Sequence, residues 1–489
     1  MCKTFLYLMI FSLALVAGGC AQNPVSGKSE FVLMSESDEL RLGRANHGKI
    51  IEEYGRYDNS ELQAYVQRIG ERVTSRSHRP GLVYRFTVLD SEEVNAFALP
   101  GGYIYITRGL LAYLNSEAEL AAVLGHEAGH VTARHSVRQY TAQQAASMGF
   151  TLGSVFLPQL RTTGANDLFN LIGGALLRGY GREHELEADR LGAEYLAKSG
   201  YDPQAMIGVI RVLKNHETFE KQRAKAENRE PNVYHGLFST HPDNDTRLKE
   251  VIGRANVFLK SGSSRIVGRN KFLTELDGLV FGQSTRNGVL RGNTFYHQDL
   301  DLTLTFPTGW RVDNHPDRLT ARPRTNDALL QITIQDLNRR LSPREFLRER
   351  LKLKDLRNGK QVSAGSLPGY TGTLEVKTSS GRQSGRVIVI YYRNNAYIFL
   401  GAAQNEEKRR RRDSDFLAVA RSVRAMTRAE RPLAEAQRIF LLQVKSRTRY
   451  AELAKKSPIL NYPTEQLRLL NGHYPRGEPY PGDWIKLVR

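Results

Sequence analysis

Cysteine is almost absent from this chain of 489 residues, and its two cysteines, Cys2 and Cys20, lie within the first twenty positions. The rest of the chain therefore has neither a disulfide framework nor a thiolate metal site. Long apolar runs are also lacking, so the sequence predicts no transmembrane helix. Acidic residues are the minority charge, because 70 lysines and arginines oppose 51 aspartates and glutamates.

The resulting formal net charge of +19 raises the question of a nucleic-acid partner. The basic residues are spread along the chain and no nucleic-acid motif accompanies them, so we expect no such partner. A solvated basic surface, with anionic lipid as its candidate neighbour, is the preferred interpretation. One dense basic run, residues 408–412, is flanked by Glu406, Glu407 and Asp413, which predicts an exposed loop or helix start without a functional role.

The first twenty residues have the pattern of a secretion signal. Lys3 supplies the positive start, residues 5–17 form the apolar core, and small residues lead to Cys20. The pattern resembles a bacterial lipoprotein signal, although Ala17 stands where leucine is usual. This resemblance implies cleavage before Cys20, a lipid on its sulfur, and a position on the periplasmic side of the outer membrane. The alternative is a plain cleaved signal and a soluble periplasmic protein.

The stretch from Leu124 to His130 carries the clearest chemistry. His126 and His130 are four residues apart, so on a helix both imidazoles can reach a single metal ion. Glu127 is poorly placed as a third ligand but well placed to take a proton from an activated water. This is the H-E-x-x-H arrangement of zinc hydrolases, and it predicts one zinc ion. Ser116 and Glu119 predict a capping box where the helix begins.

A catalytic zinc needs three protein ligands and one open position. His135 is the first downstream candidate, but the metzincin pattern would require glycine at 133 and histidine at 136, so we expect His135 at the surface or at a helix end. The helix starting near Arg182 is the better source. Its Glu185 and Asp189 share one face, so one carboxylate can bind the metal while the other accepts a hydrogen bond from a ligand imidazole.

These motifs, together with Asn95-Ala-Phe and Pro100-Gly-Gly, resemble metallopeptidase family forty-eight over roughly residues 23–265. The chain is most similar to the soluble periplasmic members of that family. The resemblance implies a mainly helical gluzincin-type domain. The roles that it implies are zinc ligation by His126, His130 and Glu185, general base catalysis by Glu127, and hydrogen bonding to a ligand by Asp189.

The segment Ser239-Thr-His-Pro242, which is followed by Arg247, also looks like an element of this family. The resemblance makes His241 a possible regulatory zinc ligand, one that reaches the open coordination position and inhibits the enzyme. The alternative is a helix-entry residue, because Pro242 suits the first turn and Asp243 suits the positive end of the helix dipole.

Residues 84–89 and 95–106 alternate as strands, and Pro100 interrupts the second of them. Such a strand suits a sheet edge beside a cleft, where an extended substrate can pair with it. The candidate substrate-binding positions are Ala98, Gly101, Gly102 and Tyr103. A hairpin that binds no ligand is the alternative.

We predict an α+β chain with several parts: a signal peptide (residues 1–20), a zinc metallopeptidase domain with a small edge sheet (21–265) and a linker (266–289). An α+β accessory domain follows at 290–428, with a weak resemblance to PsbP or Mog folds. Residues 437–489 show a strand–helix–helix–strand order that resembles a LysM module and implies contact with peptidoglycan, although the Gly-Asp turn usual after its first strand is replaced by Ser446-Arg-Thr448.

The sequence thus predicts a zinc endopeptidase of the cell envelope that acts on unfolded, misfolded or stalled outer-membrane proteins. The alternative is a chaperone or assembly factor with little proteolytic turnover. A peptidoglycan hydrolase is a third and weaker possibility, because no pair of glycosidase carboxylates can be singled out.

Overall fold

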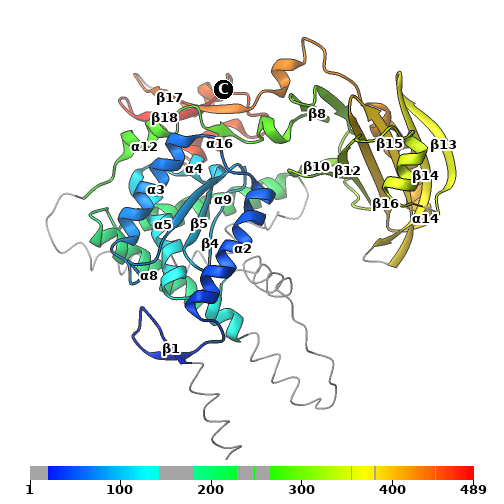
Figure 1. The fold of residues 1–489 in the computed structure, drawn as a ribbon. Coiled ribbons are helices and arrows are strands. Elements are labelled where there is room, and N and C mark those ends of the chain that lie inside the picture. The colour runs from blue at the N-terminus through cyan, green and yellow to red at the C-terminus, as the bar shows by residue number, and fades with distance from the viewer. Residues whose placement is uncertain are drawn as a thin grey trace, which may run out of the picture. The chain divides into compact units, whose positions relative to one another are not determined.

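The computed structural model describes residues 20–142, 180–227, 231, 247, 265–353, 355–378, 381–445 and 448–489. The chain forms two compact units, one of Met1–Phe281 with Arg438–Arg489 and one of Gly282–Gln437 (Figure 1). Within the described ranges, no helix has both the length and the apolar character that crossing a membrane requires. The expected signal peptide lies outside the described residues apart from Cys20, which opens strand β1 (Cys20–Gln22) opposite β2 (Ser29–Phe31).

The first unit is mainly helical. Its helices are α2 (Glu36–Tyr54), α3 (Ser60–Thr74), α4 (Arg108–Tyr113), α5 (Glu117–Thr132), α8 (Arg182–Lys198), α9 (Ala205–Ala226) and α12 (Arg269–Glu275). Helix α5 carries the H-E-x-x-H motif and is packed by α3, α8 and α9. Ser116 caps it as predicted, by accepting a hydrogen bond from the Glu119 amide. The Glu119 carboxylate, however, accepts from the amide of Asn115 and does not complete the predicted capping box.

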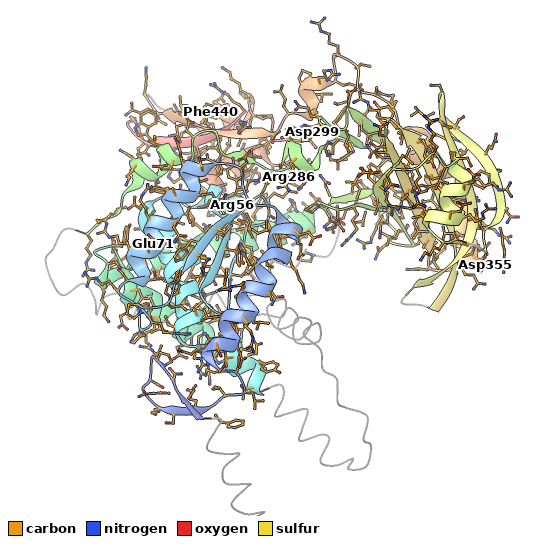
Figure 2. The ribbon with its side chains drawn as sticks, viewed as in Figure 1. Arg56, Glu71, Arg286, Asp299, Asp355 and Phe440 are labelled. Atoms are coloured by element: carbon orange, nitrogen blue, oxygen red, sulfur yellow. The ribbon has the colours of Figure 1, made fainter. Side chains whose placement is uncertain are left out.

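A three-stranded sheet lies beside α5, in the order β3–β5–β4. Strand β3 (Arg85–Leu89) is parallel to β5 (Tyr103–Thr107), and β4 (Ala96–Leu99) is antiparallel to it. Strand β4 therefore lies at an edge of the sheet, which agrees with the predicted small edge sheet. Tyr103, in contrast, begins the central strand. Side chains fill the space between this sheet and the helices around it (Figure 2).

Three glycines allow α5 and α8 to approach closely. A Cβ atom on Gly129 would lie 3.0 Å from the carbonyl oxygen of Ala188, and one on Gly192 would lie 3.0 Å from the amide nitrogen of His126. Gly125 faces Gly192 at the same crossing. Because no side chain separates the two backbones here, the acidic residues of α8 can reach the histidines of α5.

The C-terminal residues fold as predicted into β17 (Gln437–Gln443), α15 (Tyr450–Ala454), α16 (Pro463–Leu470) and β18 (Trp484–Val488). These elements belong to the first unit, because α16 packs against α4 and α9. Lys486 of β18 is fully buried and donates hydrogen bonds of 2.6 Å to the carbonyl oxygens of Ala112 and Leu114. On β17, the ring of Phe440 (Figure 2) carries the guanidinium of Arg489 3.7 Å above its centroid.

The segment expected as a linker, residues 266–289, contains regular structure. It holds α12 and strand β6 (Val280–Phe281), and β6 extends the C-terminal sheet in the order β18–β17–β6. Phe272 and Leu273 of α12 are completely buried. Their apolar side chains explain why α12 packs against the first unit.

The second unit is built on an antiparallel sheet in the order β10–β11–β12–β16–β15–β14–β13. The strands are β10 (Arg311–Asn314), β11 (Leu319–Arg322), β12 (Ala328–Asp336), β13 (Arg357–Ala364), β14 (Leu367–Thr378), β15 (Gly381–Tyr392) and β16 (Asn395–Ala403). Helix α14 (Glu406–Arg421) packs Phe416 and Val419 into one core of this unit, and Phe346 and Leu347 belong to a second core. A smaller sheet contains β7 (Val289–Arg291), β8 (Thr294–His297) and β9 (Leu302–Thr305).

The dense basic run lies in the first turns of α14, so the predicted helix start is confirmed. Its charges are largely matched within the helix, because Arg410 pairs with Glu406 and Arg411 pairs with Glu407. The predicted exposure holds for Arg410 and Arg411 but not for Arg409, which is buried and pairs with Glu406 and Asp413.

Candidate metal centre

Helices α5 and α8 bring His126, His130 and Glu185 together in the interior of the first unit. The Nε2 atoms of the two histidines are 3.0 Å apart. Glu185 places one carboxylate oxygen 3.6 Å from His126 Nε2 and the other 3.5 Å from His130 Nε2. All three side chains are buried, and Glu185 is completely shielded from solvent. The structure therefore joins the three ligands expected from two distant motifs.

The spacing of these atoms fits a zinc ion. Zinc–nitrogen bonds of about 2.0–2.1 Å in a tetrahedron place the ligand atoms about 3.3–3.4 Å from one another. The observed separations of 3.0, 3.5 and 3.6 Å bracket that value. Two imidazoles and one carboxylate are also a donor set that is typical of catalytic zinc. Three protein ligands leave a fourth position for water or substrate.

His126 is oriented by Asp189, one turn beyond Glu185 on α8. Its Nδ1 atom lies 2.8 Å from the carboxylate of Asp189, so Nε2 is left to face the ligand cluster. Burial opposes ionisation of Asp189, but Arg247 beside it holds the pKa of that carboxyl well below its usual range. Asp189 therefore stays ionised and accepts the proton of Nδ1, as expected for the partner of a metal-binding histidine.

His130 is oriented by a different group. Its Nδ1 atom is 2.8 Å from Nδ1 of His135, and Nε2 of His135 is 3.1 Å from the carboxylate of Glu187. The hydrogen bond from His135 lowers the pKa of Glu187 to about 2, with Arg138 contributing in the same direction. The surface position predicted for His135 is thus wrong, because its side chain is completely buried, whereas the predicted helix-end position is confirmed, because helical geometry resumes at this residue.

Glu127 lies on α5 between the two ligand histidines and is 1% exposed. The ring of Tyr180 stacks on His130, with centroids 4.1 Å apart. A pocket beside these groups is lined by Ala98, Leu99 and Pro100 as well as by His130 and Tyr180. Residues at the end of the edge strand β4 therefore line the same pocket as the candidate ligand His130.

Gly101 and Gly102 have a structural explanation of their own. Both adopt positive φ angles, 81° and 87°, in the turn between β4 and β5. A Cβ atom on Gly101 would lie 2.9 Å from the carbonyl oxygen of Glu39, and one on Gly102 would lie 2.8 Å from that of Val83. Close backbone packing requires glycine at both positions, and Tyr103 is buried in the central strand. Of the four predicted substrate-binding positions, Ala98 is the one on the edge strand.

The sequence provides incomplete information about His241, Arg247 and the contact of His135 with Glu187. His241 lies outside the described residues. The sequence assigns no role to Arg247, whereas the structure places its Nη1 atom 3.1 Å from Glu185 and bonds it to Asp189. The partnership of His135 with Glu187 had no visible signal, because uninterrupted helices would turn the two residues away from the metal-binding faces.

A helix bearing a buried H-E-x-x-H pair, completed by a glutamate from a second helix, forms a group that could hold one metal ion. Residues 60–255 match the model of Peptidase family M48. Within the chain, this segment contains all the ligand candidates and the proposed general base. The match supports the prediction of a metallopeptidase of that family.

Curated relatives agree with the family match. The beta-barrel assembly-enhancing protease of Yersinia pestis is 31% identical over 202 residues, which are 40% of this chain and 39% of the relative. The protein of the same name from Escherichia coli K12 is 29% identical over 48% of this chain and 47% of the relative. The mitochondrial metalloendopeptidase OMA1 of Schizosaccharomyces pombe is 29% identical over 49% of this chain and 69% of the relative. The chain thus spans less than half the length of either bacterial relative.

Solved structures match at low similarity. Cyanobacterial PsbP from Synechocystis covers 28% of this chain and 96% of its own, with 16% identity and a TM-score of 0.22. The Saccharomyces cerevisiae Ran-binding protein Mog1p covers the same shares with 8% identity and a TM-score of 0.20. Scores of this size carry no argument about the second unit, so its PsbP or Mog resemblance stays a prediction.

Proposed function

We propose that this protein is a zinc-dependent endopeptidase of the bacterial cell envelope that hydrolyses misfolded or stalled outer-membrane proteins. The observation that carries the proposal is the buried convergence of His126, His130 and Glu185 beside Glu127. The family match and the protease names of the relatives support the reaction class. The names of the bacterial relatives, which refer to β-barrel assembly, motivate the choice of outer-membrane substrates.

The proposed reaction assigns a task to each buried group. His126, His130 and Glu185 would hold the zinc ion, and Asp189 would orient His126. Bound zinc would lower the pKa of a water molecule towards neutrality and polarise the scissile carbonyl group. Glu127 takes the proton from the attacking water and then delivers it to the nitrogen of the leaving amine. Ala98 on the edge strand pairs with the extended backbone of the substrate and holds the scissile bond near Glu127.

Glu127→Gln tests this assignment in the full chain. The amide keeps the size of the side chain but cannot accept the proton, so we expect zinc content to persist and casein cleavage to fall about 10²- to 10⁴-fold. Glu183→Gln is the matched control, because Glu183 is an exposed acid on α8. Undiminished cleavage by Glu127→Gln would reject the proposed mechanism.

Measuring zinc binding, cleavage and the prevention of aggregation for the parent chain distinguishes the protease from the alternative function. If the parent chain binds zinc and prevents aggregation of an unfolded outer-membrane protein without cleaving it, the chaperone or assembly-factor hypothesis replaces the protease. His241 is proposed as a regulatory zinc ligand that inhibits the resting enzyme. His241→Ala should then raise the initial rate of casein cleavage, and an unchanged rate would count against inhibition by His241.

Attachment to the periplasmic side of the outer membrane through a lipid on Cys20 is proposed from the signal pattern, with a soluble periplasmic protein as the alternative. The parent chain should incorporate labelled fatty acid and sediment with outer membranes, and Cys20→Ala should do neither. Equal sedimentation of both proteins would exclude the lipid as the anchor.

Contact of residues 437–489 with peptidoglycan is also proposed, on the basis of their strand–helix–helix–strand order. Cosedimentation of the full chain with purified sacculi tests this contact, and released muropeptides would instead indicate a peptidoglycan hydrolase. The charge distribution gives no reason to propose a nucleic-acid partner.

A further inference from the structure

Helix α5 ends immediately after its metal-binding motif, and the backbone then turns sharply. The helix stops at Thr132, and Arg134 adopts a left-handed conformation with a φ of 57° before helical geometry resumes at His135. In an uninterrupted α-helix, five residues correspond to about 500° of rotation, so His135 would point about 140° away from His130. The left-handed conformation of Arg134 instead turns the backbone so that the imidazoles of His130 and His135 face each other.

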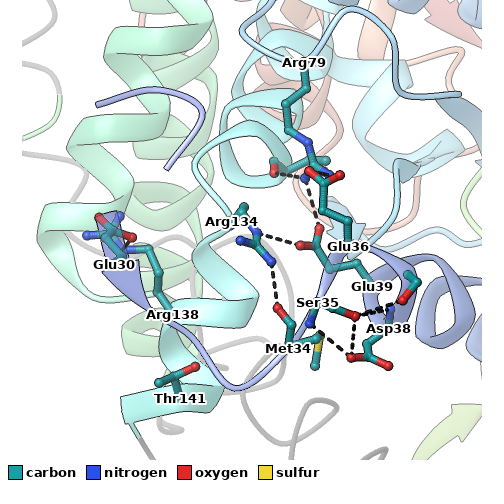
Figure 3. Close-up of polar contacts among 12 residues, drawn as sticks. Glu30, Met34, Ser35, Glu36, Asp38, Glu39, Arg79, Arg134, Arg138 and Thr141 are labelled. Carbon is teal, nitrogen blue, oxygen red and sulfur yellow. Dashed lines mark hydrogen bonds and ion pairs between the residues drawn. The ribbon is translucent and has the colours of Figure 1, made fainter. Parts of the chain in front are cut away.

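Buried ion pairs hold this turn in place. Arg134 donates from Nε to Glu39 at 2.6 Å and from Nη2 to the carbonyl oxygen of Met34 at 2.8 Å (Figure 3). Arg79 donates to the second carboxylate oxygen of Glu39 at 3.0 Å. Arg134 and Glu39 are 5% and 2% exposed. A positive φ is uncommon for a residue other than glycine, so this turn depends on the contacts that surround it.

The partners of His135 determine where its protons lie. For His130 to bind zinc through Nε2, its Nδ1 atom must carry the proton and donate it to Nδ1 of His135. Nε2 of His135 then carries the remaining proton and donates it to the carboxylate of Glu187, 3.1 Å away. Arg138 donates to the same oxygen of Glu187 at 3.0 Å and also lies 3.6 Å from Glu30. Each ring nitrogen of His130 and His135 therefore has a partner when His130 is a ligand.

We propose that His135 is a positioning residue for the zinc ligand His130, placed by the left-handed turn at Arg134 and held by Glu187. The inference rests on the proposed zinc function and extends it beyond the ligands themselves. Helix α8 then supports both histidines, because Asp189 orients His126 directly and Glu187 orients His130 through His135. His135 contacts neither the substrate nor the ion in this assignment.

The test measures zinc affinity of the full chain by competition with a chelator. His135→Phe keeps an aromatic ring but cannot accept the Nδ1 proton of His130, and we expect zinc affinity to fall about 10- to 100-fold. His135→Asn retains an acceptor near His130 and should fall between the parent and His135→Phe. Loss of an orienting hydrogen bond should also alter the visible absorption of the cobalt-substituted protein, which a purely structural role of His135 would leave unchanged.

The matched control is His216→Phe. His216 lies on α9, where its ring meets Tyr113 edge-on with centroids 4.1 Å apart, so this substitution removes a packed imidazole away from the metal centre. Zinc affinity should remain at the parent value. If His135→Phe fails to fold by circular dichroism, Glu187→Ala provides the same measurement from the other end of the contact chain, and its affinity should also fall.

The turn itself is tested by comparing Arg134→Gly with Arg134→Ala. Both lose the ion pair with Glu39, but glycine adopts a positive φ without strain and alanine does not. Arg134→Ala should therefore bind zinc more weakly than Arg134→Gly, and equal affinities would overturn the role of the turn. A parent chain that binds no zinc would reject the proposed function together with this inference. A parent that binds zinc while His135→Phe and Glu187→Ala bind it equally well would overturn the positioning role alone.

Discussion

Arg247 donates two hydrogen bonds of 2.7 Å to Asp189, from Nε to one carboxylate oxygen and from Nη2 to the other. Both side chains are buried, so this paired arrangement fixes the carboxylate in the orientation that meets His126. The guanidinium also lies 3.1 Å from Glu185. One arginine thus holds a metal ligand and the group that orients a second ligand.

Replacing Arg247 by methionine should damage both stability and metal binding. Removing one partner of a buried ion pair leaves an uncompensated charge, which costs about 3–5 kcal/mol. Because the carboxylate of Asp189 loses its fixed orientation, zinc affinity should also fall about 10- to 100-fold. Urea unfolding and chelator competition measure the two effects. Arg190→Met on α8 is the control, since Arg190 is partly exposed and its pair with Glu194 spans 3.9 Å.

Gly129 should not tolerate alanine, although alanine favours helices. Alanine gains at most about 1 kcal/mol of helix propensity. The added Cβ would lie 3.0 Å from the carbonyl oxygen of Ala188, and overpacking of this kind costs about 1–3 kcal/mol. The cost of overpacking should therefore exceed the gain in helix propensity, so the free energy of unfolding should fall. Because the added Cβ atom pushes α5 away from α8, zinc binding should also weaken.

Gly48→Ala supplies the comparison for Gly129→Ala. Gly48 is exposed on α2, and a Cβ atom there would meet nothing within 4 Å. Helix propensity should then act alone and raise the free energy of unfolding by up to about 1 kcal/mol. If both substitutions stabilise the protein, the close helix crossing does not restrict residue 129.

The two pairs of candidate residues could be predicted from the sequence because they depend on short helical spacings, whereas the choice of Glu185 as the ligand came from the family resemblance. His126 with His130, and Glu185 with Asp189, are each four residues apart, and this spacing places two side chains on one face of any regular helix. This placement does not depend on how the chain connects α5 to α8. The two pairs meet where Glu185 lies beside both imidazoles and Asp189 contacts Nδ1 of His126.

His135 and Glu187 could not be predicted in the same way. Their contact depends on the left-handed conformation of Arg134, which Glu39 stabilises from ninety-five positions earlier in the sequence. No local pattern indicates such a turn, because the residue is not a glycine. Helix α12, within residues 266–289, could not be predicted for a related reason, since its two buried side chains, Phe272 and Leu273, are adjacent and show no helical period.

Asn471 should be important for the C-terminal module. Its side chain accepts a hydrogen bond of 2.7 Å from the amide of Lys486 and donates one of 2.9 Å to the carbonyl oxygen of the same residue. Asn471→Ala leaves both buried groups without these partners, at a cost of about 1–3 kcal/mol for each. We expect faster hydrogen exchange in β18 and a lower unfolding midpoint. Asn461→Ala, at an exposed position, should change neither.

The free energy of unfolding should depend on pH through Glu93, in the loop between β3 and β4. Burial, aided by the negative charges of Glu53 and Glu92, raises the pKa of Glu93 from 4.5 to about 7. Between these values the folded chain retains a proton that the unfolded chain releases, so stability falls as pH rises. The favourable contribution is complete below pH 4.5 and is lost as pH passes through about 7.

Glu93→Gln keeps the side chain neutral at every pH and should remove this loss. The unfolding midpoint of the variant, compared with that of the parent, should therefore rise as pH increases from 4.5 to about 7 and level off at higher pH. Glu61→Gln, an exposed acid on α3, should give a difference that does not change over the same range. A constant difference for Glu93→Gln would mean that Glu93 ionises at its ordinary pKa in the folded chain, and that its burial in the loop has no effect on its proton.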